Sequence, residues 1–377
     1  MGQPATLAQL EADSHPLLAR LRETAPVAWV PELGGWLITR RDLALVVMRD
    51  AEAFTVDDPR FSTGQVVGRS MLTSDGEDHA RQRAPFARPF RLDAVRERFV
   101  GAVEAETDRL IDALEPHGRA ELRRGLAGPL AAQTMAVALG LEDVGVEAML
   151  GWYDAIVEAT SGLSTGRPVP EAGRNASVEL RSAIEARLEG DSLVAAAAGA
   201  LAPAEVSSNA AVLLFGGIET TEGMICNALL HLLSHPDQLA LVQEDRSLLG
   251  NAIEESLRLE PSAASIDRYA TRELRLGGAT IAAGDLVTVS IAGANRDPDT
   301  FPDPDSFDVR RENAGRHLAF AGGPHVCIGM HLARLEAQTA VGRLLDRLPG
   351  LRLDPARPAA PRGLVFRKPP ELHVLWG

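Results

Sequence analysis

The stretch around Cys327 has the residue types and the spacing of a metal-binding loop. The Gly-Gly-Pro run at 322–324 suits a tight, irregular backbone path rather than a helix or strand. From Met330 on, leucines recur at helical spacing, so we expect a helix to begin there. Cys327 then lies at or just before a helix N-terminus, where unpaired N–H groups and the helix dipole lower the pKa of a thiol. The resulting thiolate is a strong, soft ligand for iron.

The alternative for Cys327 is a small buried hydrophobe, which is what most free cysteines are. The chain has one other cysteine, Cys226. Two thiols in 377 residues indicate a reducing compartment and no disulfide framework. The loop by itself leaves both interpretations of Cys327 open.

A second group of chemically active residues lies inside the longest apolar helix that the sequence predicts, residues 204–233. It reads Gly216-Gly-Ile-Glu219-Thr220-Thr221. Two glycines and β-branched hydroxyl residues in mid-helix cost about 1–2 kcal/mol against alanine. Glycines let another group approach the backbone, and a threonine hydroxyl can compete for the i−4 carbonyl and open a local groove. The alternative is a close crossing of two helices at the glycines, with Glu219 in solvent.

Together the two stretches resemble the cytochrome P-450 family. The order Phe-x-x-Gly-x-x-x-Cys-x-Gly is similar to the family's haem-ligand loop, with a departure at Ala321, where many members carry glycine. The order Gly-Gly-x-Glu-Thr is similar to its distal oxygen-activation motif. The resemblance implies haem b as cofactor with Cys327 as the axial, iron-binding thiolate. It also implies Thr220 as the hydroxyl that assists dioxygen activation and Glu219 as the acid that relays protons.

The resemblance implies a wider set of haem-binding residues. His79 and Arg83 lie four apart on one face of an expected helix, and with Arg268 and His317 they match the family's propionate-binding positions. Each alone would ordinarily be a surface cation. The expected cofactor-binding set is His79, Arg83, Arg268, His317, Phe320, His325, Cys327 and Gly329.

A Glu-x-x-Arg sequence, Glu255 to Arg258, lies on the next expected helix. At this spacing the pair is ordinarily a surface salt bridge of a few tenths of a kcal/mol. Its position between the two motifs resembles the family's buried structural pair. The resemblance implies a third member from the following meander, either Arg310 or Arg311.

The expected elements are mainly helical. We expect an amphipathic helix at 5–24 interrupted by Pro16, and helices at 42–49, through most of 77–140, and at 143–160, 173–189, 204–233 and 249–260. The segment at 160–172 has the character of a mobile lid loop. We expect hairpins at 27–39 and 274–281, strands at 286–291, 350–354 and 364–375, and a long meander at 295–326.

These elements predict a mainly α fold with a small β-sheet region and no dividing linker, so residues 1–377 are expected to form a single domain. The resemblance covers almost the whole chain from Trp36 onward. It implies the triangular fold of the family, with haem between the long distal helix and the proximal helix that follows the Cys loop.

Composition excludes several classes of function. The net charge is −14, and no basic run is long enough to bind nucleic acid. The longest apolar run, near 193–204, is too short to span a bilayer, and no secretory signal precedes the first helix. We therefore expect a cytoplasmic protein with no nucleic-acid or membrane partner. Every cation except Lys368 is arginine, which we interpret as codon bias.

The resemblance implies a haem-thiolate monooxygenase that oxidises a small, largely apolar molecule, in specialised metabolism. No flavin or iron–sulfur segment is present, so electrons must come from separate partners, which we expect to be ferredoxin and ferredoxin reductase. We expect docking near Cys327 and Arg83, on a patch completed by Arg81, Arg88 and Arg334. The alternatives are a haem-thiolate sensor without turnover and a redox-neutral isomerase or dehydratase. Glu219 and Thr220 argue against both, because neither function needs a dioxygen proton relay.

Overall fold

The computed structural model describes residues 5–164, 167–189 and 192–377. Most of this chain is helical. The helices are α1 (Leu7–Glu11), α2 (His15–Thr24), α3 (Arg41–Arg49), α4 (Ser62–Val67), α5 (Gly76–Ala87), α6 (Leu92–Leu114), α7 (Gly128–Leu139), α8 (Val146–Ser164), α9 (Glu171–Glu185), α10 (Leu193–Ala198), α11 (Pro203–Ser234), α12 (Pro236–Glu244), α13 (Leu249–Leu259), α14 (Ile291–Ala294) and α15 (Met330–Arg347).

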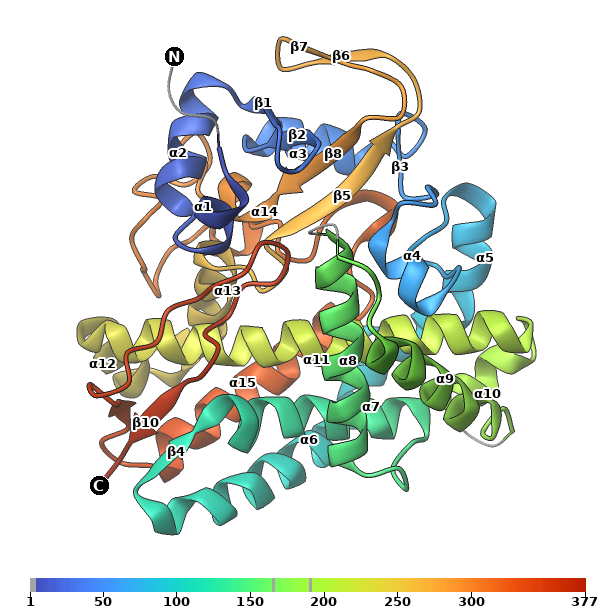
Figure 1. Cartoon of the computed structure of the whole chain (residues 1–377). Helices are drawn as coiled ribbons and strands as arrows, with labels where there is room; N and C mark the ends of the chain where they lie inside the picture. The colour runs from blue at the N-terminus through green and yellow to red at the C-terminus, as the bar shows by residue number, and fades with distance from the viewer. Residues whose placement is uncertain (1–4, 165–166, 190–191) are drawn as a thin grey trace.

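The strands are short and gather mainly above the helices (Figure 1). They are β1 (Val27–Val30), β2 (Gly35–Ile38), β3 (Phe54–Thr55), β4 (Arg119–Glu121), β5 (Ser265–Ala270), β6 (Leu274–Leu276), β7 (Ala279–Ile281), β8 (Leu286–Ser290), β9 (Arg352–Leu353) and β10 (His373–Leu375). One sheet has the order β1-β2-β8-β5-β3, another β4-β10-β9, and β6 pairs with β7. β2 runs parallel to β8, and the remaining pairs are antiparallel.

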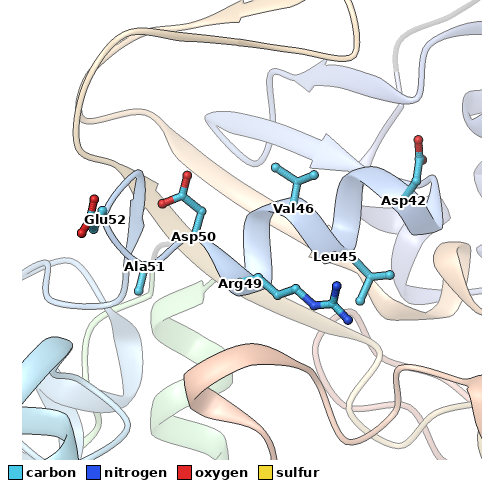
Figure 2. A pocket seen from close by; sticks show the side chains of 7 residues that line it. All are labelled: Asp42, Leu45, Val46, Arg49, Asp50, Ala51 and Glu52. Atoms are coloured by element: carbon cyan, nitrogen blue, oxygen red, sulfur yellow. The ribbon is translucent and has the colours of Figure 1, made fainter.

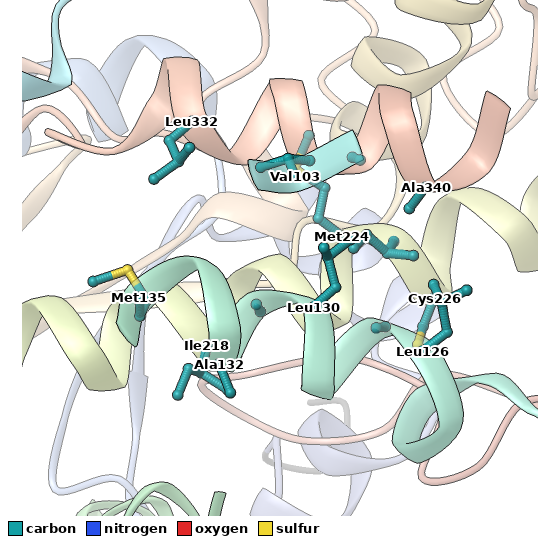
Figure 3. Packing of buried hydrophobic residues seen from close by; sticks show 14 of the residues in the cluster. Val103, Leu126, Leu130, Ala132, Met135, Ile218, Met224, Cys226, Leu332 and Ala340 are labelled. Atoms are coloured by element: carbon teal, nitrogen blue, oxygen red, sulfur yellow. The ribbon is translucent and has the colours of Figure 1, made fainter. Parts of the chain in front are cut away.

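Helix α11 is the central element of the helical layer (Figure 1). Its 32 residues span about 48 Å at 1.5 Å per residue. It packs against α7, α8, α9, α13 and α15. Because partners surround it, most of its side chains are buried and apolar. Figure 3 shows side chains of this core from several helices, among them Met135 of α7, Ile218 of α11 and Leu332 of α15.

Several expected boundaries were wrong for local reasons. Pro16 does not interrupt a helix but occupies the first turn of α2, where its missing N–H costs nothing. The segment 119–121 is strand β4 rather than helix, since it pairs with β10 from the C-terminal end of the chain. Of the expected final strands, 350–354 is reduced to Arg352–Leu353 and 364–375 to His373–Leu375, with isolated bridges at Phe366 and Lys368 before it. Helices α4, α10 and α12 were not expected.

The expected lid segment at 160–172 is shorter than its sequence indicated, because α8 continues to Ser164 and α9 begins at Glu171. Residues 165–166 of that segment lie outside the described residues. Among the residues that the structure describes, no helix is both long enough and apolar enough to cross a membrane.

Candidate functional site

A cavity of about 320 Å³ lies between α11 and the loop that carries Cys327. One wall is the middle of α11, and the opposite wall is the stretch from Ala319 to Gly329 with the start of α15. Strand β5, helix α4 and the C-terminal segment at Val365 and Phe366 close the remaining sides. The cavity therefore joins the two motifs that the sequence keeps about a hundred residues apart.

A second, wider hollow of about 720 Å³ lies on the surface along α3 (Figure 2). Its lining is a mixture of small charged and aliphatic side chains, from Asp42 to Glu52. It offers no thiol, imidazole or hydroxyl for chemistry. The candidate site is therefore the smaller cavity beside Cys327.

The loop before Cys327 is closed by a hydrogen bond from its backbone N–H to the carbonyl of Phe320, at 2.9 Å. Gly323 has φ +70°, and a Cβ there would lie 2.3 Å from the Met48 carbonyl, so only glycine lets the loop seat on α3. Ala321 also has positive φ, at 58°. Its methyl costs about 1 kcal/mol in that conformation, where a glycine would be unstrained.

The helix that follows Cys327 begins at Met330, as expected, with Gly329 as its N-cap. The expected lowering of the thiol's pKa was wrong for the protein without metal. Burial raises the pKa of the Cys327 thiol, and a hydrogen bond from the Gly329 backbone only partly offsets this. Coordination to a metal ion ionises such a thiol outright.

A buried cation borders the same cavity. Arg268 on β5 is 5% exposed and donates to the Asp267 carbonyl at 2.7 Å. Among the described residues, no carboxylate forms an ion pair with Arg268. A buried guanidinium without an anion is costly, so the site fits a ligand that brings a negative group to Arg268. Arg83 on α5 also lines the cavity and donates to the Val326 carbonyl at 2.7 Å.

The expected histidines occupy three different environments. His325 lines the cavity and pairs with Asp75 at 2.8 Å. His79 does not line it; its ring packs edge-on against His325, with 4.2 Å between centroids. Burial, together with the charges of His325 and Arg83, lowers the pKa of His79 to about 4. His317 also lies off the cavity, where its Nε2 is 3.2 Å from Glu254.

The two mid-helix motif residues of α11 point in different directions. Thr220 lines the cavity, and its hydroxyl donates to the Gly216 carbonyl at 2.6 Å, the i−4 bond expected of a helix groove. Gly217 supports the alternative of a helix crossing, because a Cβ there would lie 2.4 Å from Met135 Sδ of α7. Gly216 has open space beside it. The groove interpretation therefore applies to Gly216, and the helix-crossing interpretation applies to Gly217.

Glu219 is neither in solvent nor on the cavity wall. It is 2% exposed, accepts a hydrogen bond from the Tyr153 hydroxyl of α8, and lies 2.9 Å from Lys368 Nζ. Tyr153 and Lys368 were missed by sequence reasoning. Lys368 carried a signal, since it is the only lysine in the chain.

The Glu-x-x-Arg pair is buried and has the third member that was expected. Arg258 contacts Glu255 through Nε at 2.7 Å and Nη2 at 2.8 Å, and both side chains are fully buried. Arg311, not Arg310, completes the group, with Nε 2.8 Å from Glu255 Oε1. Arg258 also donates to the carbonyls of Asn295, Pro304 and Ser306, so it fixes the meander that leads to Cys327.

The donor set limits what Cys327 could hold. No group of three His, Cys, Asp or Glu side chains able to chelate a bare ion occurs in the part of the chain that the structure describes. An iron bound at Cys327 must therefore bring most of its ligands with it, as iron in a macrocycle does. The buried Arg268 beside the same cavity fits an acidic substituent on such a group.

Comparison with known proteins gives a consistent result. A model of the cytochrome P450 family matches residues 176–370. The chain is 36% identical to cytochrome P450 monooxygenase PikC of Streptomyces venezuelae, over 97% of this chain and 90% of that protein. It is 33% identical to 6-deoxyerythronolide B hydroxylase of Saccharopolyspora erythraea, over 92% and 93%. The crystal structure of P450BioI with hexadec-9Z-enoic acid ligated acyl carrier protein superposes with a TM-score of 0.89 at 27% identity, over 98% of this chain and 99% of that one.

Proposed function

The chain belongs to the cytochrome P450 family and is a monooxygenase of the kind found in specialised metabolism, and we propose how its residues hold the cofactor and select the substrate. The observation that carries the proposal is the placement of Cys327, Arg268 and Thr220 around one cavity. Family membership implies a haem-thiolate cofactor. We assign it as haem b with Cys327 as its axial ligand.

Haem, when bound, supplies the activation of dioxygen for insertion of one oxygen atom into the substrate. Arg83 and Arg268 are proposed to hold its propionates, because both line the cavity and no carboxylate in the described part of the chain forms an ion pair with Arg268. Phe320, His325 and Gly329 line the same wall. The buried Nδ1 of His79 has no hydrogen-bond partner among the described residues, which fits a propionate contact. His317 can join them only by giving up Glu254.

The opposite wall, formed by α11, is proposed to deliver protons for dioxygen activation and to exclude water. The Thr220 hydroxyl is held at the cavity by the Gly216 carbonyl, where it can hold or pass a proton. Glu219, the next residue toward the N-terminus, is the proposed proton source. Apolar walls keep bulk water from the site and so limit wasteful side reactions.

The substrate is proposed to be a small, largely uncharged molecule. Apolar side chains dominate the part of the wall away from Cys327: Phe61, Met71, Leu72, Val212, Leu213, Phe215, Ile266, Val365 and Phe366. Asp267 also borders the cavity, but its carboxylate accepts from the Thr288 hydroxyl within the sheet at 2.6 Å. Since the wall supplies shape and hydrophobic contact, an apolar compound gains most by entering it.

Members of this family in bacteria take electrons from separate redox partners. We propose ferredoxin and ferredoxin reductase for this chain. The expected basic docking patch is smaller than the sequence indicated, because Arg81 pairs with Glu205 and Asp78, and Arg334 pairs with Glu254. Arg88 remains exposed, as does Val326 of the Cys loop. We further propose that residues 1–377 form one domain and that the protein works in the cytoplasm, which its two unpaired thiols fit.

The test is a spectral titration of the purified haem protein with a fixed panel: testosterone, myristic acid and 6-deoxyerythronolide B. A compound that enters the cavity displaces iron-bound water and shifts the spin state of the haem. Oxygen consumption that depends on that compound, with ferredoxin and reductase present, supports the monooxygenase. Haem binding without compound-dependent oxygen consumption would favour the sensor, and conversion of a compound without oxygen or electrons would favour the isomerase or dehydratase.

A further inference from the structure

A buried polar cluster lies behind Thr220, outside the cavity. It contains two carboxylates of α11, Glu219 and Glu222, and they meet the single lysine of the chain. Lys368 Nζ lies 2.9 Å from Glu219 Oε2 and 2.6 Å from Glu222 Oε1, and it donates to the Tyr153 hydroxyl at 2.7 Å. Tyr153 in turn donates to Glu219. Lys368 therefore donates hydrogen bonds to Tyr153 and Glu222 and forms an ion pair with Glu219, and its side chain is 11% exposed.

Glu222 has two arginine partners in addition to Lys368. Arg123 Nε lies 2.6 Å from Glu222 Oε1, and Arg124 Nη1 lies 3.7 Å from Oε2. Glu219 has no arginine within ion-pair distance among the described residues. Its buried carboxylate depends on Lys368 and on the Tyr153 hydroxyl. The two carboxylates therefore differ in their partners: arginines also stabilise Glu222, whereas Glu219 relies on Lys368 and Tyr153.

The choice of lysine has a physical reason. All other cations in the chain are arginine, yet this position is filled by lysine. A Cβ on Gly223 would lie 3.4 Å from Lys368 Cβ and 2.9 Å from Ser262 Oγ, so the backbone of α11 already approaches the stem closely. A compact ammonium can point one hydrogen at each of three oxygens, whereas the flat guanidinium of arginine binds best in one plane.

Tyr153 connects this cluster to the cavity wall. Thr160 lies seven residues, or two helical turns, after Tyr153 on α8 and lines the cavity. Residues seven apart share one face of a helix. A displacement of α8 by a compound in the cavity therefore acts directly on the hydroxyl that binds Glu219.

We propose that Lys368 is a positioning residue: together with Tyr153 it holds the Glu219 carboxylate outside the cavity, and occupation of the cavity shifts α8 and releases that carboxylate toward Thr220. The proposal rests on the proposed function, because it assigns Glu219 as the proton source of the same site. It makes proton supply depend on a compound being present.

The first experiment reads the amine of Lys368 directly and needs no turnover. Intact haem protein is acetylated with an N-hydroxysuccinimide ester, and peptide mass spectrometry separates the only lysine from the N-terminal amine. The panel compound with the largest spin shift is expected to raise the acetylation rate of Lys368 by roughly threefold or more. Tyr153→Phe is expected to raise it without any compound. If neither the compound nor Tyr153→Phe changes the acetylation rate of Lys368, the proposed release of Glu219 is overturned.

The second experiment separates positioning from structural support. In Lys368→Met the Glu219 carboxylate is no longer held outside the cavity, so proton supply no longer depends on a compound being present, and product formed per oxygen consumed is expected to fall roughly threefold or more. Oxidation driven by hydrogen peroxide is expected to stay within about twofold, since peroxide supplies oxygen, electrons and protons together. Lys368→Arg, which keeps the charge, is expected to regain about half of the lost coupling. If Lys368→Met is not stable enough to purify, Tyr153→Phe serves for the same comparison.

Two results would overturn the proposal: unchanged coupling in both variants, or an equal loss of reductive and peroxide-driven oxidation. Failure of the proposed function looks different. In that case the wild-type protein shows no haem or no peroxide-driven product, whereas the acetylation rates of Tyr153→Phe and wild type still report whether Lys368 is held.

Discussion

Arg311 donates its Nε hydrogen to Glu255 Oε1 across 2.8 Å, while the adjacent Arg310 is exposed and forms no ion pair among the described residues. Glu255 is thereby shared between Arg258 on its own helix and Arg311 on the meander. Arg311 also donates to the carbonyls of Pro302, Asp303 and Ser306. This one side chain ties α13 to the segment that leads to Cys327.

Replacing Arg311 by alanine leaves the buried Glu255 with one partner fewer. The free energy of unfolding is expected to drop by about 3–5 kcal/mol, because the buried carboxylate of Glu255 loses one of its two arginine partners. Arg310→Ala is the matched control and is expected to change it by less than about 0.5 kcal/mol. Urea unfolding followed by circular dichroism measures both. Equal effects of the two variants would contradict the role of Arg311.

Arg268 is the residue whose burial best fits an anionic cofactor group. Arg268→Gln is expected to speed haem loss roughly tenfold or more, since about 1.4 kcal/mol of lost interaction corresponds to a factor of ten. Transfer of haem to excess apomyoglobin measures the rate. The exposed Arg272→Gln, four residues further along the chain, is the control and is expected to leave the rate unchanged.

Thr220 lines the cavity, and its hydroxyl donates to the Gly216 carbonyl at 2.6 Å. Thr220→Ala is expected to keep haem and compound binding but to lower product per oxygen consumed by roughly tenfold, because proton delivery loses its positioned donor. Thr220→Ser restores the hydroxyl and is expected to recover most of the coupling. Full coupling in Thr220→Ala would show that the hydroxyl is not needed.

How much of this site the sequence predicts depends on the kind of contact. The Cys loop and the groove at Thr220 follow from local spacing, and their partners lie within a few residues. Spacing alone indicates a surface ion pair for Glu255 and Arg258, and only the family resemblance implied their burial. The position of Glu219 does not follow from local spacing. Adjacent helix residues point about 100° apart, and the contacts of each side chain depend on which other elements pack against that face of the helix. Its partners Tyr153 and Lys368 come from segments far away in the sequence. Strand β4 was missed for the same reason, since it exists only by pairing with β10.

Glu260 gives the fold a defined acid sensitivity. Burial opposes its ionisation, but hydrogen bonds and charge from His15 and Arg367 prevail and lower the pKa of Glu260 to about 2. A depressed carboxyl pKa stabilises the fold above the unfolded value near 4.5, and this stability is lost as the pH falls from there toward 2. The loss amounts to about 3 kcal/mol.

In Glu260→Gln the free energy of unfolding is therefore expected to be lower at pH 7 and to change less between pH 5 and pH 3 than in the wild type. The exposed Glu244→Gln is the control and is expected to keep the wild-type slope. Parallel slopes for Glu260→Gln and wild type would contradict the assignment.

The central claim is that Cys327 is the thiolate ligand of a haem in the cavity beside α11. The most direct measurement is the absorption spectrum of the reduced, carbon monoxide-bound protein, compared between wild type, Cys327→Ser and Cys226→Ser. The account predicts the red-shifted Soret band of thiolate-ligated haem in wild type and in Cys226→Ser, and its loss in Cys327→Ser. A red-shifted band that survives in Cys327→Ser, or a wild-type protein that takes up no haem, would contradict it.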